Sequence, residues 1–207
     1  MRVSSAMPAA SRIAWLRERF PHDELIGLSH SIGALALAGA PNAANQDRLI
    51  FIAPHTGYWG DYRLVYRLPM TVLWHGFMPV VTRLAGYFPG QRLRLCEDLP
   101  PGIALEWAQR RSPDLRSSGL RPERTQQLLD RARTLERPAT AITISDDAFA
   151  TLQAAKRLLS YFPGLRAQHI VLTPAEAGVE RLGHFGFFRR AAGRILWPRL
   201  LALIGTS

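Results

Sequence analysis

Apolar and polar residues follow two alternating patterns along the chain, and together they predict strands separated by helices. Short continuous apolar runs are typical of parallel strands covered on both faces. Such runs lie at 25–28, 49–53, 139–144 and 169–172. Helical patterns flank or separate them, at 9–19, from the small residues around Ser31 to near Gly39, and at 123–135, 151–161 and 191–204. Strands that alternate with helices predict an α/β fold with a mostly parallel sheet.

Residues 55–121 break this alternation. Aromatic residues crowd there between glycine and proline turn signals, and helices are expected at 69–84 and 102–110. The segment is long for a connection inside a compact domain, so we interpret it as a cap inserted into a single domain spanning 1–207. Most of its aromatic residues are expected to pack on helices or on the sheet. We expect Tyr58, Trp59 and Trp74 to line a substrate pocket, because caps are where such folds build substrate sites.

The stretch 25–38 combines an apolar run, a cluster of small residues around Ser31, and an Ala/Leu helix. Its S-H-S-I-G string is a variant of the G-x-S-x-G nucleophile elbow, in which a sharp turn between strand and helix needs small residues two positions before and after the serine. The pattern predicts Ser31 as nucleophile and the amide of Ile32 as a donor to a developing oxyanion. His30 occupies the variable position, where it is expected to orient or pack locally and to line the substrate pocket.

Two further features follow later strands. Asp146 and Asp147 come directly after the apolar run 139–144, and His184 stands in a glycine-containing loop after the last run. The order Ser, Asp, His is that of α/β-hydrolases, and parallel strands bring their carboxyl ends to one edge of a sheet. His184 would act as general base. Asp147 is the first choice for the acid that orients it, and Asp146 is the alternative.

Other histidines are interpreted differently. His55, His75 and His169 are expected to be packed or surface groups without a role in the chemistry. No spacing of histidines or cysteines is typical of a metal site, and no glycine-rich phosphate loop is present, so we expect neither a metal nor another cofactor.

Charge and composition narrow the function classes. The net charge is +10, but Lys156 is the single lysine and the arginines are scattered, which indicates a coding bias rather than a nucleic-acid surface. No apolar run reaches the roughly 18 residues of a membrane span. The start of the chain resembles an amphipathic helix more than a secretory signal. The single cysteine, Cys96, excludes an internal disulfide, so a reducing cytoplasm is the expected location.

Several strings resemble a group of bacterial predicted α/β-hydrolases of uncertain substrate. They are G-Y-W at 57–59, V-L-W-H at 72–75, G-Y-F-P-G at 86–90, S-D-D at 145–147, R-L-G-H-F-G-F-F at 181–188 and L-W-P-R-L-L at 196–201. The resemblance implies an α/β-hydrolase fold, a triad of Ser31, one Asp of the pair and His184, and no metal or organic cofactor. This chain has Ser29 where a glycine is common.

Members of that group are longer, with several strands before the elbow. We therefore expect this chain to lack the N-terminal part of the sheet, including the loop that supplies a second oxyanion amide. Its loss would lower turnover about a hundred- to a thousand-fold. The first hypothesis is a serine hydrolase for a small ester, thioester or amide with an apolar part. The alternative is a catalytically impaired module that binds a ligand, a protein or a second copy through an exposed sheet edge.

Overall fold

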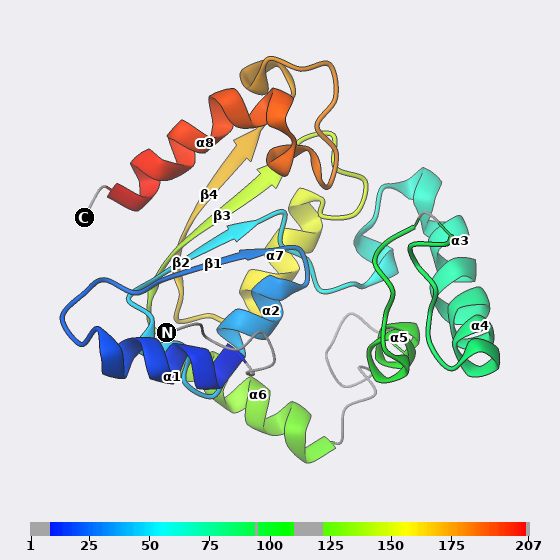
Figure 1. The fold of residues 1–207 in the computed structure, drawn as a ribbon, viewed down its shortest axis with the longest axis horizontal. Coiled ribbons are helices and arrows are strands. Elements are labelled where there is room, and N and C mark those ends of the chain that lie inside the picture. The colour runs from blue at the N-terminus through cyan, green and yellow to red at the C-terminus, as the bar shows by residue number, and fades with distance from the viewer. Residues whose placement is uncertain (1–8, 94, 110–121, 206–207) are drawn as a thin grey trace. The chain divides into compact units, whose positions relative to one another are not determined.

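The computed structural model describes residues 9–93, 95–109 and 122–205, which belong to two compact units (Figure 1). The first unit comprises Met1–Thr56 and Leu128–Ser207, and the second comprises Gly57–Gln127. We describe each unit by itself. The second unit falls on the segment predicted to form a cap at 55–121, and its role as a cap stays a prediction.

The first unit is built on a parallel sheet of four strands. They are β1 (Ile26–His30), β2 (Arg48–Ile52), β3 (Pro138–Ile144) and β4 (Arg166–Leu172), in the spatial order β1-β2-β3-β4. All three pairings are parallel. The predicted α/β fold with a parallel sheet is therefore confirmed. β4 begins three residues before the predicted run at 169–172. The apolar pattern did not include these first residues because they are exposed.

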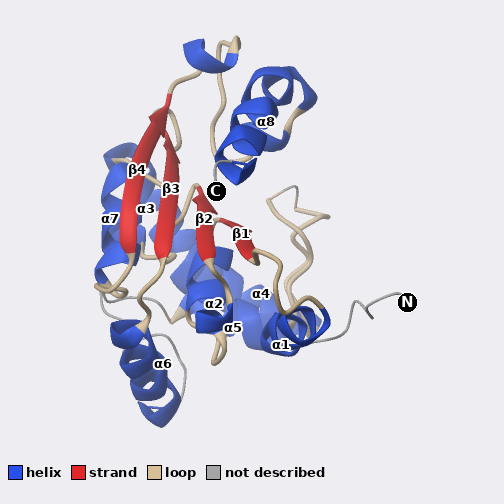
Figure 2. Cartoon of the chain, turned by 90° about the vertical axis from the view of Figure 1, so that its left-hand side faces the viewer, coloured by secondary structure: helices blue, strands red, loops and turns tan. Residues whose placement is uncertain are grey.

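Helices cover both faces of this sheet. α2 (Gly33–Ala38) and α7 (Leu152–Ser160) lie on one face, and α8 (Arg190–Gly205) lies on the other (Figures 1 and 2). α2 and α7 bury mainly alanines, whose small side chains let a helix approach the sheet closely. Thr151 caps α7, since its side chain accepts a hydrogen bond from the Ala154 N–H at 3.2 Å. α1 (Ala9–Arg19) belongs to this unit, as does α6 (Pro122–Thr134) from Leu128 onward.

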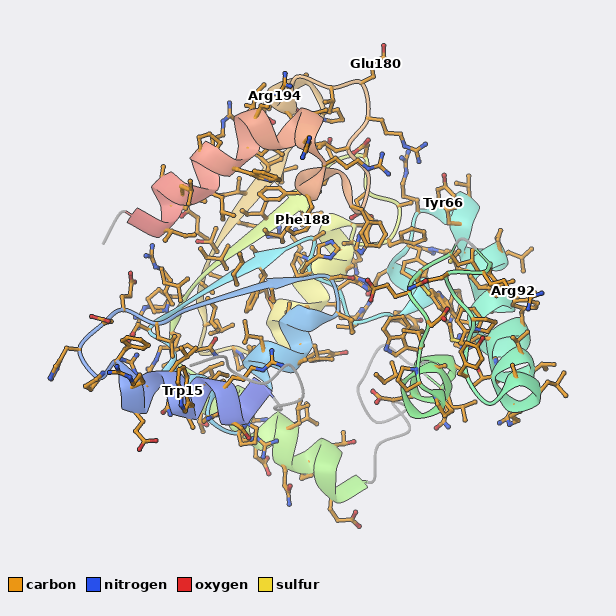
Figure 3. All side chains as sticks on the ribbon, viewed as in Figure 1. Trp15, Tyr66, Arg92, Glu180, Phe188 and Arg194 are labelled. Carbon is orange, nitrogen blue, oxygen red and sulfur yellow. The ribbon has the colours of Figure 1, made fainter. Side chains whose placement is uncertain are left out.

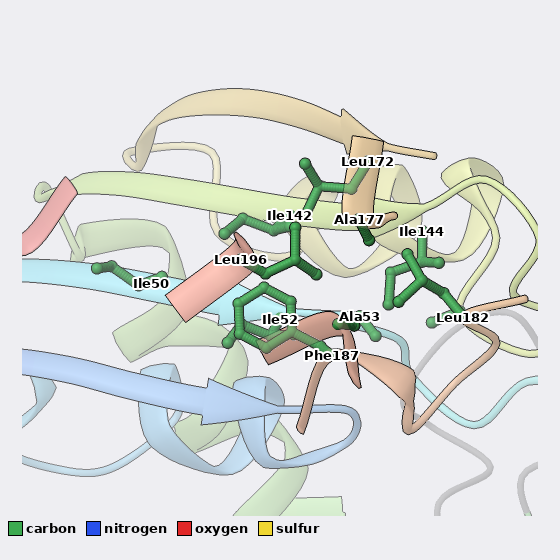
Figure 4. Close-up of a cluster of buried hydrophobic side chains, with 12 residues drawn as sticks. Ile50, Ile52, Ala53, Ile142, Ile144, Leu172, Ala177, Leu182, Phe187 and Leu196 are labelled. Atoms are coloured by element: carbon green, nitrogen blue, oxygen red, sulfur yellow. The ribbon is translucent and has the colours of Figure 1, made fainter. Parts of the chain in front are cut away.

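The core between the sheet and α8 fixes the strands in place (Figure 4). Alternate strand residues point to the same face, so Ile50 and Ile52 share a face, as do Ile142 and Ile144. They pack in one buried cluster with Phe187 and Leu196 among others. Each such side chain contributes roughly 1.5–3 kcal/mol when fully buried. The carboxyl ends of the strands are thus held by a rigid scaffold.

The second unit is helical. It contains α3 (Leu64–Val72), a π-helical turn (Leu73–Phe77), α4 (Met78–Ala85) and α5 (Pro101–Ala108). The helix predicted at 69–84 begins earlier and is interrupted by the π turn, which lies between Pro69 and Pro79. Neither proline has the N–H that a regular helical ladder needs. Met78, Phe88 and Ala104 form a small buried core, with Trp74 and Trp107 packed against it.

Of the helices that the structure describes, none combines the length and the apolar character that a membrane span requires.

Candidate active site

The site is assembled by hydrogen bonds that continue each strand pairing one residue beyond the strand. The N–H of Ser31 donates to the Ile52 carbonyl at 2.9 Å, and the N–H of Ala53 donates to the Ile142 carbonyl at 2.8 Å. In the same way the Ser145 N–H donates to the Leu172 carbonyl at 2.9 Å. The first residues after β1, β2 and β3 are therefore held side by side at one edge of the sheet. The loops that follow carry the candidate residues.

Ser31 occupies the sharp turn between β1 and α2. Its φ is +60°, in the left-handed region that costs an L-residue roughly 1–2 kcal/mol. Among the described residues, Ser31 and Ala53 are the two non-glycine residues with positive φ, and both lie at this edge of the sheet. Backbone strain of this kind clusters at functional sites. The strand–turn–helix arrangement that the S-H-S-I-G string predicts is present.

The small residues around the turn face each other. A Cβ atom placed on Gly33 would lie 3.7 Å from the Cβ of Ser29, which is ordinary van der Waals contact. The steric requirement at these two positions is therefore for small side chains, and Ser29 in place of a glycine fits it.

Ser31, His184 and Asp147 form a continuous line of hydrogen bonds. The Oγ of Ser31 lies 2.9 Å from Nε2 of His184, and Nδ1 of His184 lies 2.7 Å from Oδ2 of Asp147. A carboxylate only accepts, so Nδ1 carries the proton of a neutral His184 ring, and Nε2 is left to accept the Ser31 hydroxyl proton. These two side chains are almost fully buried, with 8 % of His184 and none of Asp147 exposed. The three predicted residues are brought together.

The two aspartates differ in what they contact. Asp147 accepts from His184 with one oxygen, and with the other from the N–H groups of Phe149 and Ala150 at 2.8 and 3.0 Å. Burial alone would raise the pKa of Asp147. The hydrogen bond and positive charge of His184, together with the two backbone N–H groups, outweigh burial and hold that pKa below its usual range.

Asp146 accepts from the N–H groups of Leu182 and Gly183, at 3.0 and 2.9 Å. These two hydrogen bonds hold the loop at 182–183 against Asp146. That loop leads directly into His184. Asp147 is thus the carboxylate on the His184 ring, and Asp146 fixes the backbone before it.

His184 is surrounded by rings. His30 lies 4.7 Å from it between ring centres, and Phe149 and Phe185 pack edge-on to it at 5.8 and 4.9 Å. Phe188, labelled in Figure 3, lies edge-on to His30 at 5.1 Å. Nε2 of His30 donates to the main-chain carbonyl of His184 at 3.0 Å. Burial lowers the pKa of His30, more than its bond to that carbonyl raises it.

The remaining predicted site residues are Ile32 and three aromatic residues. The N–H of Ile32 makes no hydrogen bond to any residue within the described ranges, so it is available to bind an oxyanion. Tyr58, Trp59 and Trp74 belong to the second unit. Tyr58 and Trp59 lie 5.6 Å apart, while Trp74 packs edge-on to Trp107 at 5.8 Å. Their place in a substrate pocket stays a prediction.

One residue of the site was missed by the sequence interpretation. Nε2 of His55 lies 2.7 Å from the Ser31 Oγ, whereas the sequence indicated a packed or surface group. His75 and His169 do have structural partners, the carbonyl of Ala108 at 2.7 Å and the hydroxyl of Thr143 at 3.3 Å. The overlooked signal was position, because His55 follows β2 at the same offset at which Asp147 follows β3.

No protein-family model matches the chain, and no curated protein matches it in sequence. Several solved structures match the chain in fold. The monoacylglycerol lipase of Paleococcus ferrophilus matches with a TM-score of 0.52 and 10 % identity, over 94 % of this chain and 73 % of that one. A protein of unknown function from Staphylococcus aureus subsp. aureus Mu50 also gives a TM-score of 0.52, at 9 % identity, over 94 % of this chain and 69 % of that one. At these identities the likeness shows the fold. The chain therefore has the α/β-hydrolase fold that its motifs predict.

Proposed function

We propose that this chain is a serine hydrolase that cleaves an ester, thioester or amide bond through an acyl-enzyme intermediate. The observation that carries the proposal is the hydrogen-bonded line from Asp147 through His184 to Ser31, with Ser31 in a strained turn at the head of a helix. A hydroxyl, an imidazole and a buried carboxylate in this order form a nucleophile, a base and the group that orients the base.

The proposed reaction has an acylation step and a deacylation step. Ser31 Oγ attacks the substrate carbonyl carbon while Nε2 of His184 takes the hydroxyl proton. Asp147 stabilises the imidazolium, and the Ile32 N–H donates to the oxyanion. His184 then gives its proton to the leaving alcohol, thiol or amine, and an acyl group remains on Oγ. A water molecule attacks the acyl carbon with His184 as base, the acid leaves, and the proton returns to Ser31.

Apolar rings support an apolar acyl or alcohol part in the substrate. Phe185 directly follows His184 and Phe188 packs edge-on to His30, and 55 % and 45 % of their respective surfaces are exposed. Exposed phenylalanines beside the proposed base and beside His30 favour a substrate that buries apolar surface on them. The structurally similar protein from Paleococcus ferrophilus is named a monoacylglycerol lipase, which agrees with a small molecule carrying an apolar chain.

The proposed steps use no metal or organic cofactor, and we place the reaction in a reducing cytoplasm.

Labelling with a fluorophosphonate probe tests the proposal, because the probe phosphonylates a serine that a neighbouring base activates. The wild-type chain is expected to be labelled, and Ser31→Ala and His184→Ala are expected to abolish labelling. Ser160→Ala and His169→Asn are matched controls in the same unit, and both are expected to be labelled at the wild-type rate. A folded wild-type chain that stays unlabelled would contradict the proposal and favour the binding module.

A further inference from the structure

The Oγ of Ser31 contacts two imidazole rings. Nε2 of His184 lies 2.9 Å away and Nε2 of His55 lies 2.7 Å away, both within hydrogen-bonding distance. The two rings are 5.4 Å apart between centres and are inclined at 69°. Ser31 therefore lies between two histidines, and only His184 has a part in the proposed reaction.

The protons available decide what each histidine does. A serine hydroxyl carries one hydrogen and can accept through its lone pairs. His184 uses its Nδ1 proton on Asp147, so its Nε2 takes the serine hydrogen. The contact from His55 is then a hydrogen bond only if Nε2 of His55 carries a proton. The geometry thus assigns His55 as a donor to Oγ.

A neutral His55 suits the proposed reaction better than a protonated one. During the proposed reaction His184 becomes an imidazolium, and a second positive ring 5.4 Å away would oppose that step. A neutral His55 with its proton on Nε2 donates to Oγ without this repulsion. Asp147 provides the compensating charge on the His184 side.

The backbone before His55 holds it in place. Ala53 is completely buried, has φ of +48° and is tied to β3 by its bond to the Ile142 carbonyl. Pro54, which follows, fixes its own φ. A strained alanine and a proline directly after β2 aim the next side chain at the edge of the sheet where Ser31 lies. Such strain persists only where the surrounding structure enforces it.

We propose that His55 is a second catalytic histidine, which donates from Nε2 to the Ser31 oxygen throughout the reaction. This inference rests on the proposed function. In acylation the bond stabilises Oγ as its proton moves to His184. In deacylation Oγ is the leaving group, and the same bond stabilises it until His184 returns the proton. His55 neither gains nor loses a proton.

Two substitutions separate donation from proton transfer. His55→Gln keeps an N–H donor near the position of Nε2 and cannot act as a base, whereas His55→Phe keeps a ring and has no donor. We expect His55→Phe to slow fluorophosphonate labelling about 10- to 100-fold, the effect of losing a hydrogen bond to a charged oxygen. His55→Gln is expected to stay within about threefold of wild type, since its donor is retained. His169→Asn is the matched control.

A measurement independent of activity accompanies the labelling. Nitrogen-15 NMR of the imidazole rings in the uninhibited chain reports which nitrogen of each histidine is protonated. We expect a proton on Nε2 of His55 and on Nδ1 of His184, and a shift of the His55 Nε2 resonance in Ser31→Ala.

Three results would overturn the inference while leaving the proposed function intact. They are wild-type labelling in His55→Phe, labelling of His55→Gln as slow as that of a correctly folded His55→Phe, and an unprotonated Nε2 on His55. Failure of the proposed function is different, since the wild-type chain itself would not be labelled. The NMR measurement would then still decide whether His55 donates to Ser31.

Discussion

His30 donates from its ring to the main-chain carbonyl of His184, at 3.0 Å, so the residue before the proposed nucleophile holds the proposed base. His30 and His184 are 154 positions apart in sequence, and the contact joins the last residue of β1 to the loop after β4. The carbonyl only accepts, so Nε2 of His30 carries a proton. We therefore expect His30 to act on the proposed reaction through another residue, as a positioning group.

Replacing His30 tests this relationship. His30→Ala removes the donor and a ring from beside His184, and we expect labelling to slow about 10- to 100-fold, because small misplacements of reacting groups cost this much. His30→Gln retains an N–H donor and is expected to recover most of the rate. Labelling rates with matched melting curves make the comparison. Equal rates in His30→Ala and wild type would remove the positioning role.

We expect substitutions of the two aspartates to have different effects on turnover and on stability. Asp147→Asn leaves the shape of the site but favours the wrong His184 tautomer, and we expect turnover to fall about 10⁴-fold. Asp146→Asn keeps one acceptor for two backbone N–H groups. We expect it to lose about 1–2 kcal/mol of stability, with a much smaller effect on turnover. Hydrolysis of a chromogenic ester and thermal unfolding measure the two effects, and the reverse ranking of turnover would assign Asp146 as the triad acid.

Strain at Ser31 predicts a stability difference between two inactive variants. Ser31→Ala and Ser31→Gly both remove Oγ, but only glycine adopts a φ of +60° without steric cost. We expect Ser31→Gly to be the more stable variant by up to about 1 kcal/mol, after the greater flexibility of unfolded glycine is counted. Chemical denaturation of both variants measures this difference. A more stable alanine variant would show that the turn is not strained.

Stability is expected to fall in mildly acidic solution. Burial lowers the pKa of both His30 and His169, with the charge of Lys156 adding to the effect at His169. Below the ordinary histidine pKa of about 6.5 the unfolded chain takes up protons that the folded chain resists. The stabilisation is therefore complete above about pH 6.5 and is lost as the pH falls through the lowered values.

Melting temperatures between pH 8 and pH 5 measure this dependence. We expect a decline that starts near pH 6.5 and is shallower in His30→Gln and in His169→Asn. A decline of unchanged steepness in both variants would assign the effect to other groups.

The turn also has a steric limit. Because a Cβ on Gly33 would meet that of Ser29 at 3.7 Å, we expect Gly33→Ala to fold and to be labelled normally. Gly33→Leu would force the two sides of the turn apart, and we expect labelling to fall at least about tenfold, as reacting groups lose alignment. Normal labelling of Gly33→Leu would show that the turn accommodates bulk.

Much of the sheet could be predicted from the sequence because its central strands are buried on both faces. β2 and β3 are continuous apolar runs, whereas the edge strand β4 starts with exposed residues and its beginning was missed. Ser31 and the aspartates could be found because each follows an apolar run. The choice between Asp146 and Asp147 could not be made, since it depends on which carboxylate the loop turns toward His184.

His55 shows a different limit of sequence interpretation. No motif surrounds it, and a single histidine after a strand is more often packed than reactive. His55 follows Ala53, whose φ is positive. An alanine in the sequence gives no indication of such a backbone conformation. The positions of the helices in the second unit were also only partly predictable, because a π turn between two prolines leaves no pattern of its own.

The hydrogen bond from Ala53 to Ile142 has a consequence for how this protein could vary. β2 and β3 are already joined across the sheet at the point where the chain departs toward the second unit. The length and content of the intervening segment therefore place little demand on the strands, provided that 53–55 are kept. The segment between β2 and β3 is therefore a position where insertions, deletions and replacements are tolerated. Segments of another length or sequence there would leave the sheet and the contacts of Ser31 with His184 and His55 unchanged.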